Sequence, residues 1–186
     1  EFDVSDLSCQ IACQIPKNGV AGGFDPNDWM EPKEQRKVDD FIIYAMSAAT
    51  QALSDAGWKP TAYEDQIRTG VLIGSGIGGI NTMLAEVEAL RERGPDRVSP
   101  FLIPMMISDS AAGMIAIRVG ARGPNMSIAT ACATGTNAVG EAAEMIRRGA
   151  ADVMIAGAAE ASIVSVAIAG MNVMGALSTR NGDPER

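Results

Sequence analysis

Histidine is absent from the 186 residues of the chain, so the sequence lacks the commonest general base and the commonest nitrogen ligand for metals. Aromatic residues are scarce, at 4%. No apolar run reaches the length of about 18 residues that a transmembrane helix needs. The opening EFDVSDLSCQ has no basic segment before an apolar one, which argues against a signal peptide. The net charge of −8 argues against a general nucleic-acid binder, because such proteins present basic surfaces.

Cysteine is also rare: there are three, an odd number in a chain long enough to build a core without disulfides. We therefore expect a reducing compartment, the cytoplasm. Cys9 and Cys13 occur in LSCQIACQI, where they alternate with apolar residues. This pattern predicts a strand with both thiols on the same side, as small buried residues. Two thiols without further ligands do not indicate a metal site.

Helical and strand patterns alternate along the rest of the chain. A helix is predicted over roughly 37–56, because apolar residues recur there at helical spacing until Gly57, with Pro60 beyond it. The other predicted elements are strands at 71–73, 124–131 and 151–157, helices at 80–94, 108–120, 134–149 and 162–175, and a proline-punctuated loop at 94–106. Continuous apolar strands alternating with helices predict an α/β fold with a parallel sheet covered on both faces.

The stretch GSGIGG, residues 74–79, fits the glycine pattern of dinucleotide-binding folds and lies between a predicted strand and a predicted helix. That motif also needs a second strand ending in Asp or Glu about 20 residues later. The corresponding region, RERGPDRVSPFLIP, contains no strand pattern. We therefore interpret the glycines as a tight turn that lines a pocket, and a nucleotide-binding dehydrogenase as the weaker alternative.

Cys132 stands where a predicted strand gives way to a predicted helix. The expected apolar stripe of that helix is Ala138, Val139, Ala142, Ala143 and Ile146. The positive end of the helix dipoles favours the thiolate, the nucleophilic form of cysteine. Small neighbours such as Ala131 leave room for a substrate, and the backbone N–H of Cys132 is available to an oxyanion. A buried, inert cysteine is the alternative that these residues leave open.

The segment SIATACATGTNAVGEAAEMIRRGAADVMIAGAAEA closely resembles the active-site segment of β-ketoacyl-[acyl-carrier-protein] synthases, the type II condensing enzymes of fatty-acid synthesis. The resemblance extends through EPKEQRKVDDF, GVLIGSGIGGI, VSPFLIPMMI, GARGPNMSIATAC and GALSTRNGDPER. It implies a thiolase-like α/β fold, layered α-β-α-β-α in the complete enzyme. Members of this family use two histidines from their C-terminal half, and this chain has none. We therefore expect residues 1–186 to be an incomplete N-terminal half, without the family's first strand.

The resemblance also implies roles for particular residues. Cys132 is the expected acyl-accepting nucleophile, with Ala131 beside it as a substrate-binding residue. Ile77 matches the gate of the family's acyl pocket, and Leu102 matches a position that contributes to the neighbouring subunit's pocket. A basic cluster matches the patch that docks the acidic carrier protein: Lys33, Arg36 and Lys37, which Arg97 could extend. The alternatives are core packing for Ile77 and Leu102, and a solvated helix start for the basic cluster.

The implied reaction is a decarboxylative Claisen condensation that needs no cofactor. Its implied partners are the acyl and malonyl forms of acyl-carrier protein, and the implied assembly is a homodimer without nucleic acid or membrane. Three other functions remain open. They are a polyketide-type ketosynthase, a non-catalytic chain-length partner of the same fold, and a thiolase, which uses acyl-CoA. The presence of Cys132 speaks against the non-catalytic partner.

Overall fold

A parallel sheet of three strands organises residues 26–161 in the computed structural model, which describes residues 2–183 and 185. The strands are β1 (Thr69–Gly74), β2 (Asn125–Met126) and β3 (Val153–Ala158), in the order β2-β1-β3. β1 pairs with β3 along its full length and with β2 at Val71 and Leu72. Because the strands are parallel, their carboxyl ends lie at one edge of the sheet.

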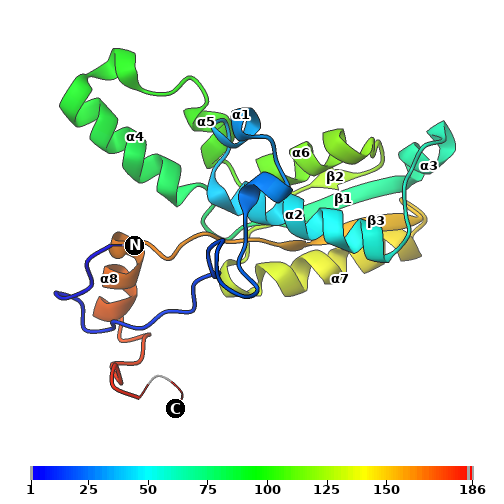
Figure 1. Cartoon of the computed structure of the whole chain (residues 1–186). Helices are drawn as coiled ribbons and strands as arrows, with labels where there is room; N and C mark the ends of the chain where they lie inside the picture. The colour runs from blue at the N-terminus through cyan, green and yellow to red at the C-terminus, as the bar shows by residue number, and fades with distance from the viewer. Residues whose placement is uncertain (1, 184, 186) are drawn as a thin grey trace. The chain divides into compact units, whose positions relative to one another are not determined.

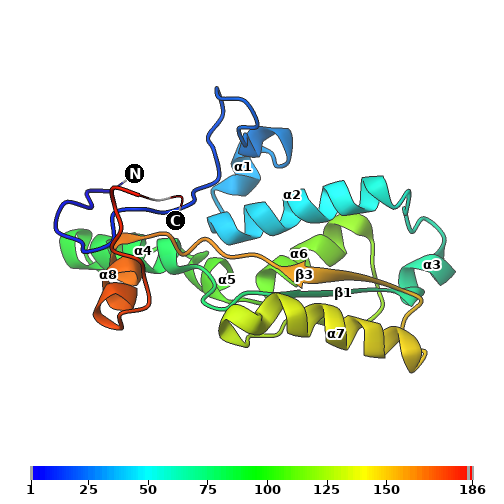
Figure 2. The same cartoon turned by 90° about the horizontal axis from the view of Figure 1, so that it is seen from below.

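Helices cover both faces of this sheet, as the sequence predicts (Figures 1 and 2). α2 and α6 lie on one face and α7 on the other. The helical elements of residues 26–161 are η1 (Pro26–Asp28), α1 (Pro32–Gln35), α2 (Asp40–Asp55), α3 (Tyr63–Arg68), α4 (Ile80–Arg93), η2 (Pro95–Arg97), α5 (Leu102–Met106), α6 (Ser110–Val119), η3 (Ala131–Ala133) and α7 (Thr134–Arg147). No helix of the described residues combines the length and the apolar character that a membrane crossing requires.

The core of residues 26–161 lies on both faces of β1, which α2 and α6 cover on one side and α7 on the other. Every residue of β1 is buried, as expected for the central strand of a covered parallel sheet. α2 contributes Phe41 and Ile42, which are fully buried, and α6 contributes Ile115. α2 begins at Asp39, whose carboxylate accepts a hydrogen bond from the Phe41 N–H and so caps the helix. The predicted helix at 37–56 is thereby confirmed.

The buried stripe of α7 differs from the predicted one. Ala138 and Ala142 are buried as expected, together with Thr134 and Met145. Val139 and Ile146, which were expected in the stripe, are 57% and 43% exposed. The helix turns its small residues toward β1 and β3, because alanine allows a helix and a sheet to approach closely.

Two predicted segments are wrong in part. The predicted loop at 94–106 contains η2 and α5. The predicted strand at 124–131 ends at Met126. Beyond that point hydroxyl groups take part in the hydrogen bonds: the Ser127 hydroxyl donates to the Ser108 carbonyl at 3.3 Å, and the Thr130 N–H donates to the Thr134 hydroxyl at 2.9 Å. These bonds shape a turn, which apolar residue patterns do not indicate.

Residues 2–25 and 162–183 form a second unit, which includes residue 185 and contains the predicted last helix, α8 (Ser165–Val173). The segment around Cys9 forms no strand, so the strand predicted there is wrong. Its backbone is held by asparagine side chains, since the N–H of Cys9 donates to Asn172 at 3.2 Å and that of Gln10 to Asn181 at 2.8 Å. The two thiols also differ, with Cys9 buried and Cys13 exposed.

Candidate functional site

Cys132 lies at the centre of η3, the single turn that leads into α7, and its side chain is exposed. The preceding residue, Ala131, has φ of 50° and is the one non-glycine residue with a positive φ among those described. This backbone conformation is unfavourable for a residue with a Cβ, and it persists only where the surrounding structure enforces it. The strained backbone of Ala131 therefore lies directly before the residue that carries the thiol.

A short hydrogen-bond chain holds the strained turn. The Thr134 hydroxyl donates to the Ala131 carbonyl at 2.7 Å and accepts the Thr130 N–H at 2.9 Å. The Thr130 hydroxyl donates in turn to the Asn137 side-chain oxygen at 2.7 Å. Thr134 is only 3% exposed, so its hydroxyl is fixed within the protein. These side chains preorganise the turn that presents Cys132 to solvent.

The start of α7, next to Cys132, is suited to an anionic ligand or intermediate. α7 runs for 14 residues from Thr134, and its first turn contains no acidic residue. The N-terminal end of a helix has unpaired N–H groups and a partial positive charge, which stabilise a nearby anion. An exposed thiol in this position can act as a nucleophile toward an activated carbonyl.

The glycine loop, residues 74–79, lies beside this turn. A Cβ built on Gly76 would stand 3.5 Å from the Cα of Ala131 and 3.4 Å from its carbonyl oxygen. The next residue, Ile77, is 49% exposed. The structure therefore brings three of the predicted site residues, Ile77, Ala131 and Cys132, to the carboxyl edge of the sheet, where parallel folds bind their ligands.

Glu160 connects the segment after β3 with the glycine loop after β1. It follows β3, and its carboxylate accepts three hydrogen bonds from the glycine loop: 3.1 Å from the Ser75 hydroxyl, 2.9 Å from the Gly76 N–H and 3.1 Å from the Ile77 N–H. In a dinucleotide-binding loop such N–H groups point at phosphate. Here a carboxylate already occupies them, and its charge repels phosphate. This arrangement supplies a physical reason for rejecting the dinucleotide-binding interpretation.

Leu102 is the first residue of α5 and is half-buried. α5 packs against α4 and α6. Its opposite end meets the glycine loop, where the Gly79 N–H donates to the Met106 carbonyl at 3.0 Å. A side chain at position 79 would collide with the backbone of Met105, so glycine is required for this approach. Leu102 and Ile77 thus lie on two segments that are in direct contact.

The predicted basic cluster is exposed. Lys33 lies on α1, and Arg36 and Lys37 follow it directly. Among the residues that the structure describes, Lys33 and Arg36 form no ion pair, while the Lys37 ammonium lies 5.4 Å from the centre of the Phe101 ring. Arg97 lies on η2, which packs against α4, four residues before Phe101. Through Phe101, Lys37 therefore contacts the segment that follows Arg97.

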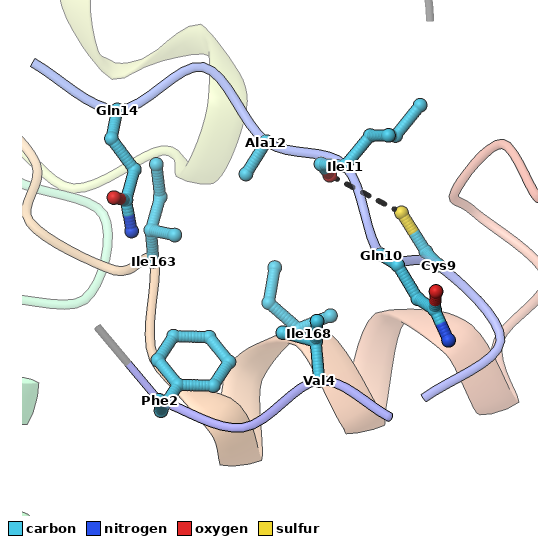
Figure 3. A pocket seen from close by; sticks show the side chains of 9 residues that line it. All are labelled: Phe2, Val4, Cys9, Gln10, Ile11, Ala12, Gln14, Ile163 and Ile168. Atoms are coloured by element: carbon cyan, nitrogen blue, oxygen red, sulfur yellow. Dashed lines mark hydrogen bonds between the residues drawn. The ribbon is translucent and has the colours of Figure 1, made fainter. Parts of the chain in front are cut away.

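Two cavities are lined by other residues. One, of about 210 Å³, lies in the second unit; Figure 3 shows Phe2, Val4 and Ile168 around it, with the Cys9 thiol donating to the Ile11 carbonyl at 3.4 Å. The other, of about 350 Å³, runs between α2 and β3. None of the predicted site residues lines either cavity. Within the described part of the chain, no group of His, Cys, Asp and Glu side chains could hold a metal ion.

Sequence reasoning missed the polar residues that support the site, namely Glu160, Ser75, Thr134 and Asn137. Glu160 had one available signal: it ends the apolar run ADVMIAGAAE, and a carboxylate after a buried parallel strand lies at the ligand-binding edge of the sheet. The threonine and asparagine give no such signal, because they are equally common at ordinary helix starts.

Comparison with known proteins agrees with this geometry. Residues 2–186 match the family model described as "Beta-ketoacyl synthase, N-terminal domain". The chain belongs to the β-ketoacyl synthase family. It is 54% identical to the 3-oxoacyl-[acyl-carrier-protein] synthase 2 of Rhizobium meliloti over 188 aligned residues, which cover all of this chain and 45% of that protein. It is 43% identical to the protein of the same name from Vibrio cholerae, covering 43% of it.

Solved structures confirm the thiolase-like ketosynthase fold. A β-ketoacyl synthase from Burkholderia phymatum superposes with a TM-score of 0.77 at 28% identity, over 96% of this chain and 42% of that one. A ketosynthase solved with its type II polyketide acyl-carrier protein and a bound hexaketide gives a TM-score of 0.73 at 25% identity, over 82% of this chain and 44% of that one. The chain thus spans somewhat less than half the length of these β-ketoacyl synthase relatives.

Proposed function

We propose that this chain is the nucleophile-bearing part of a 3-oxoacyl-[acyl-carrier-protein] synthase in fatty-acid elongation. The single observation that supports this most directly is the exposed Cys132 thiol, held by a strained turn at the start of α7. We further propose that residues 1–186 work within a polypeptide of about the length of the relatives, called the full-length protein below.

In the proposed reaction the Cys132 thiolate attacks the carbonyl carbon of an acyl-carrier thioester. The carrier thiolate leaves, takes up a proton and dissociates, and the acyl group remains on sulfur as a new thioester. The malonyl-carrier protein then loses carbon dioxide, and the electrons of the broken C–C bond form an enolate. The enolate attacks the acyl carbonyl, and the Cys132 thiolate leaves. The product is a 3-oxoacyl-carrier protein that is two carbons longer.

The chain itself supplies the thiolate and backbone donors. The N–H of Cys132 lies on η3 and is suited to hold the oxyanion of each tetrahedral intermediate. Decarboxylation also requires donors near the malonyl carbonyl. We assign these donors to histidines elsewhere in the full-length protein, because the 186 residues contain none. The proposed chemistry requires no cofactor, since loss of carbon dioxide drives the condensation.

The acyl chain is proposed to enter beside the glycine loop. Ile77 is the apolar side chain nearest in sequence to the Gly76–Ala131 contact, and its 49% exposure leaves it free to line a pocket. Leu102 lies on α5, which contacts the same loop through Met106. We propose that Ile77 acts as the gate of the acyl pocket and that Leu102 contributes to the pocket of the partner subunit in a homodimer.

The carrier protein is proposed to dock on Lys33, Arg36 and Lys37, with Arg97 extending the patch. Lys33 and Arg36 form no ion pair with another described residue, and all four cations are exposed on a chain whose net charge is −8. Basic side chains left unpaired on an acidic protein are suited to an acidic partner, for which they also raise the association rate. A solved relative binds an acyl-carrier protein, as its description states.

The free thiols are consistent with the cytoplasm, where we place the protein.

Replacement of Cys132 by alanine in the full-length protein tests the proposal. We expect loss of 3-oxoacyl product to the background level, with an unchanged far-ultraviolet circular dichroism spectrum.

A polyketide ketosynthase is the second candidate, favoured by the structural similarity to a polyketide ketosynthase at 25% identity. It predicts an unreduced chain built by successive condensations on one enzyme, whereas the main proposal predicts one condensation per acyl substrate.

A further inference from the structure

The glycine loop is tied to the end of β3 by a closed set of hydrogen bonds. The Ser75 hydroxyl donates to the Glu160 carboxylate at 3.1 Å and accepts the Gly78 N–H at 2.9 Å. The N–H groups of Gly76 and Ile77 donate to the other carboxylate oxygen of Glu160 at 2.9 and 3.1 Å. One acidic side chain from the segment after β3 therefore accepts hydrogen bonds from three successive residues of the loop.

We propose that Glu160 is a positioning residue, whose carboxylate fixes the glycine loop beside the Ala131–Cys132 turn and thereby sets the room that Ile77 leaves for an acyl chain. This inference rests on the proposed function only for the identity of the ligand. The geometry of the loop is independent of it, because the three contacts of Glu160 are made within the folded chain.

Charge explains why a carboxylate suits this position. Two successive N–H groups that point the same way form a concave site for an anion, and bonds to an ionised acceptor are stronger than neutral ones. Ser75 is 1% exposed, so its hydroxyl reaches Glu160 from the protein interior and cannot turn to solvent. Without an anion at 160, Gly76 and Ile77 would present unpaired donors next to the thioester of an acylated Cys132.

A second link crosses the same gap immediately beyond the loop. The Asn81 side chain donates to the Ala161 carbonyl at 2.8 Å, which ties the start of α4 to the residue after Glu160. This bond remains when Glu160 is replaced. The effect of such a replacement should therefore be confined to residues 75–78, and the helix that follows them should keep its place.

The loop can be tested in the full-length protein with the variants Glu160→Ala, Glu160→Gln and Ser75→Ala. The matched control is Glu141→Ala, which removes an exposed carboxylate of α7 that pairs with Arg148 at 3.3 Å. One measurement is amide hydrogen exchange of a peptide spanning residues 75–78. The other is the ratio of kcat/KM for dodecanoyl over butanoyl thioesters, with acetyl transfer to Cys132 as a reference for the nucleophile.

Glu160→Ala is expected to raise amide exchange at Gly76 and Ile77 and to shift the chain-length ratio by about tenfold, the size of change that a pocket altered by a methylene or more produces. Glu160→Gln should lie between Glu160→Ala and the wild type, because its amide oxygen still accepts one hydrogen bond. Acetyl transfer and the Glu141→Ala control should stay at wild-type values. Unchanged exchange and an unchanged ratio in folded Glu160→Ala would overturn the proposal.

Two further outcomes keep the inference separate from the proposed function. If Glu160→Ala fails to fold, Glu160→Gln and Ser75→Ala decide the matter by the same two measurements, since each removes only part of the contacts. If the wild-type protein transfers no acyl group to Cys132, the proposed function fails, and the exchange at Gly76 and Ile77 still decides whether Glu160 fixes the loop.

Discussion

The buried carboxylate of Asp39 accepts two hydrogen bonds from Thr82, one from its backbone N–H and one from its hydroxyl, both at 2.8 Å. Asp39 also caps α2 through the Phe41 N–H at 3.3 Å. One side chain thus satisfies the starts of two helices, α2 and α4, that lie more than forty positions apart in the chain. Through α4 it fixes the point at which the glycine loop ends.

Replacing Asp39 by alanine should therefore destabilise the protein. The change removes a helix cap and leaves the buried N–H and hydroxyl of Thr82 without an acceptor, a combined loss of about 3 kcal/mol. Urea unfolding measures it. Asp55→Ala is the matched control, because Asp55 is exposed at the last position of α2, where a negative charge is not favoured. Equal effects of the two changes would show that the Asp39–Thr82 contact contributes little.

The ion pair of Arg68 and Asp152 predicts a pH dependence. The side-chain hydrogen bonds from Arg68, at 2.9 and 2.5 Å, hold the pKa of Asp152 below its ordinary value of 3.8. A carboxylate with a lowered pKa in the folded state adds stability above its unfolded pKa and loses it as the pH falls through the folded value. Asp152→Asn should be less stable than the wild type at neutral pH.

The difference in unfolding free energy between Asp152→Asn and the wild type should shrink steadily as the pH is lowered below about 4. Asp152 then becomes protonated first in the unfolded protein and, at lower pH, in the folded protein. Unfolding in urea at a series of pH values measures this. A difference that stays constant down to the lowest accessible pH would show that Asp152 acts through packing and that the charge of the pair contributes nothing.

The sequence predicts the elements whose pattern is set locally. α4 ends before Gly94, and α6 ends before Gly120, which is in the left-handed conformation, as glycines after apolar periodicity indicate. The position of Cys132 just before α7 was predictable from the helical pattern that begins after it. The Glu160 contacts were not predictable, because they join residues 83 to 85 positions apart. The strand predicted around Cys9 failed because alternation signals exposure on one side and does not supply a neighbouring strand.

Reversing the charge of Lys33, Arg36 and Lys37 should weaken the reaction with acyl-carrier protein. We expect KM for the carrier substrate to rise about tenfold and its salt dependence to flatten, because exposed charges act mainly on association. Transfer from a small acyl thioester without carrier should be unchanged. Steady-state kinetics at several salt concentrations measure both effects.

A matched pair of double variants separates docking from net charge. Lys33→Glu with Arg36→Glu is compared with Lys59→Glu and Arg122→Glu, which alter exposed cations elsewhere by the same total charge. Only the first pair should raise KM for the carrier substrate. Equal increases would mean that overall charge, and no defined patch, governs the reaction. Arg97→Glu alone shows whether the patch extends to η2.

Enlarging Ile77 to phenylalanine should shorten the acyl chains that the full-length protein accepts. The loop that holds Ile77 is packed against Ala131 on one side and fixed by Glu160, so we expect the added volume to enter the proposed acyl pocket. Dodecanoyl transfer should fall while acetyl transfer is retained. Ile77→Leu, which conserves volume, is the control. A chain-length profile of Ile77→Phe that matches the wild type, in a protein of normal stability, would argue against a gate.

Acylation of Cys132 tests the central claim most directly. The full-length protein is incubated with dodecanoyl-carrier protein, quenched in acid, and analysed by intact mass and peptide mapping. We expect one dodecanoyl adduct per chain on Cys132, absent in Cys132→Ala and unchanged in Cys13→Ser, which removes the other exposed thiol. An adduct on Cys13, or no adduct on a folded protein that binds the carrier, would contradict it.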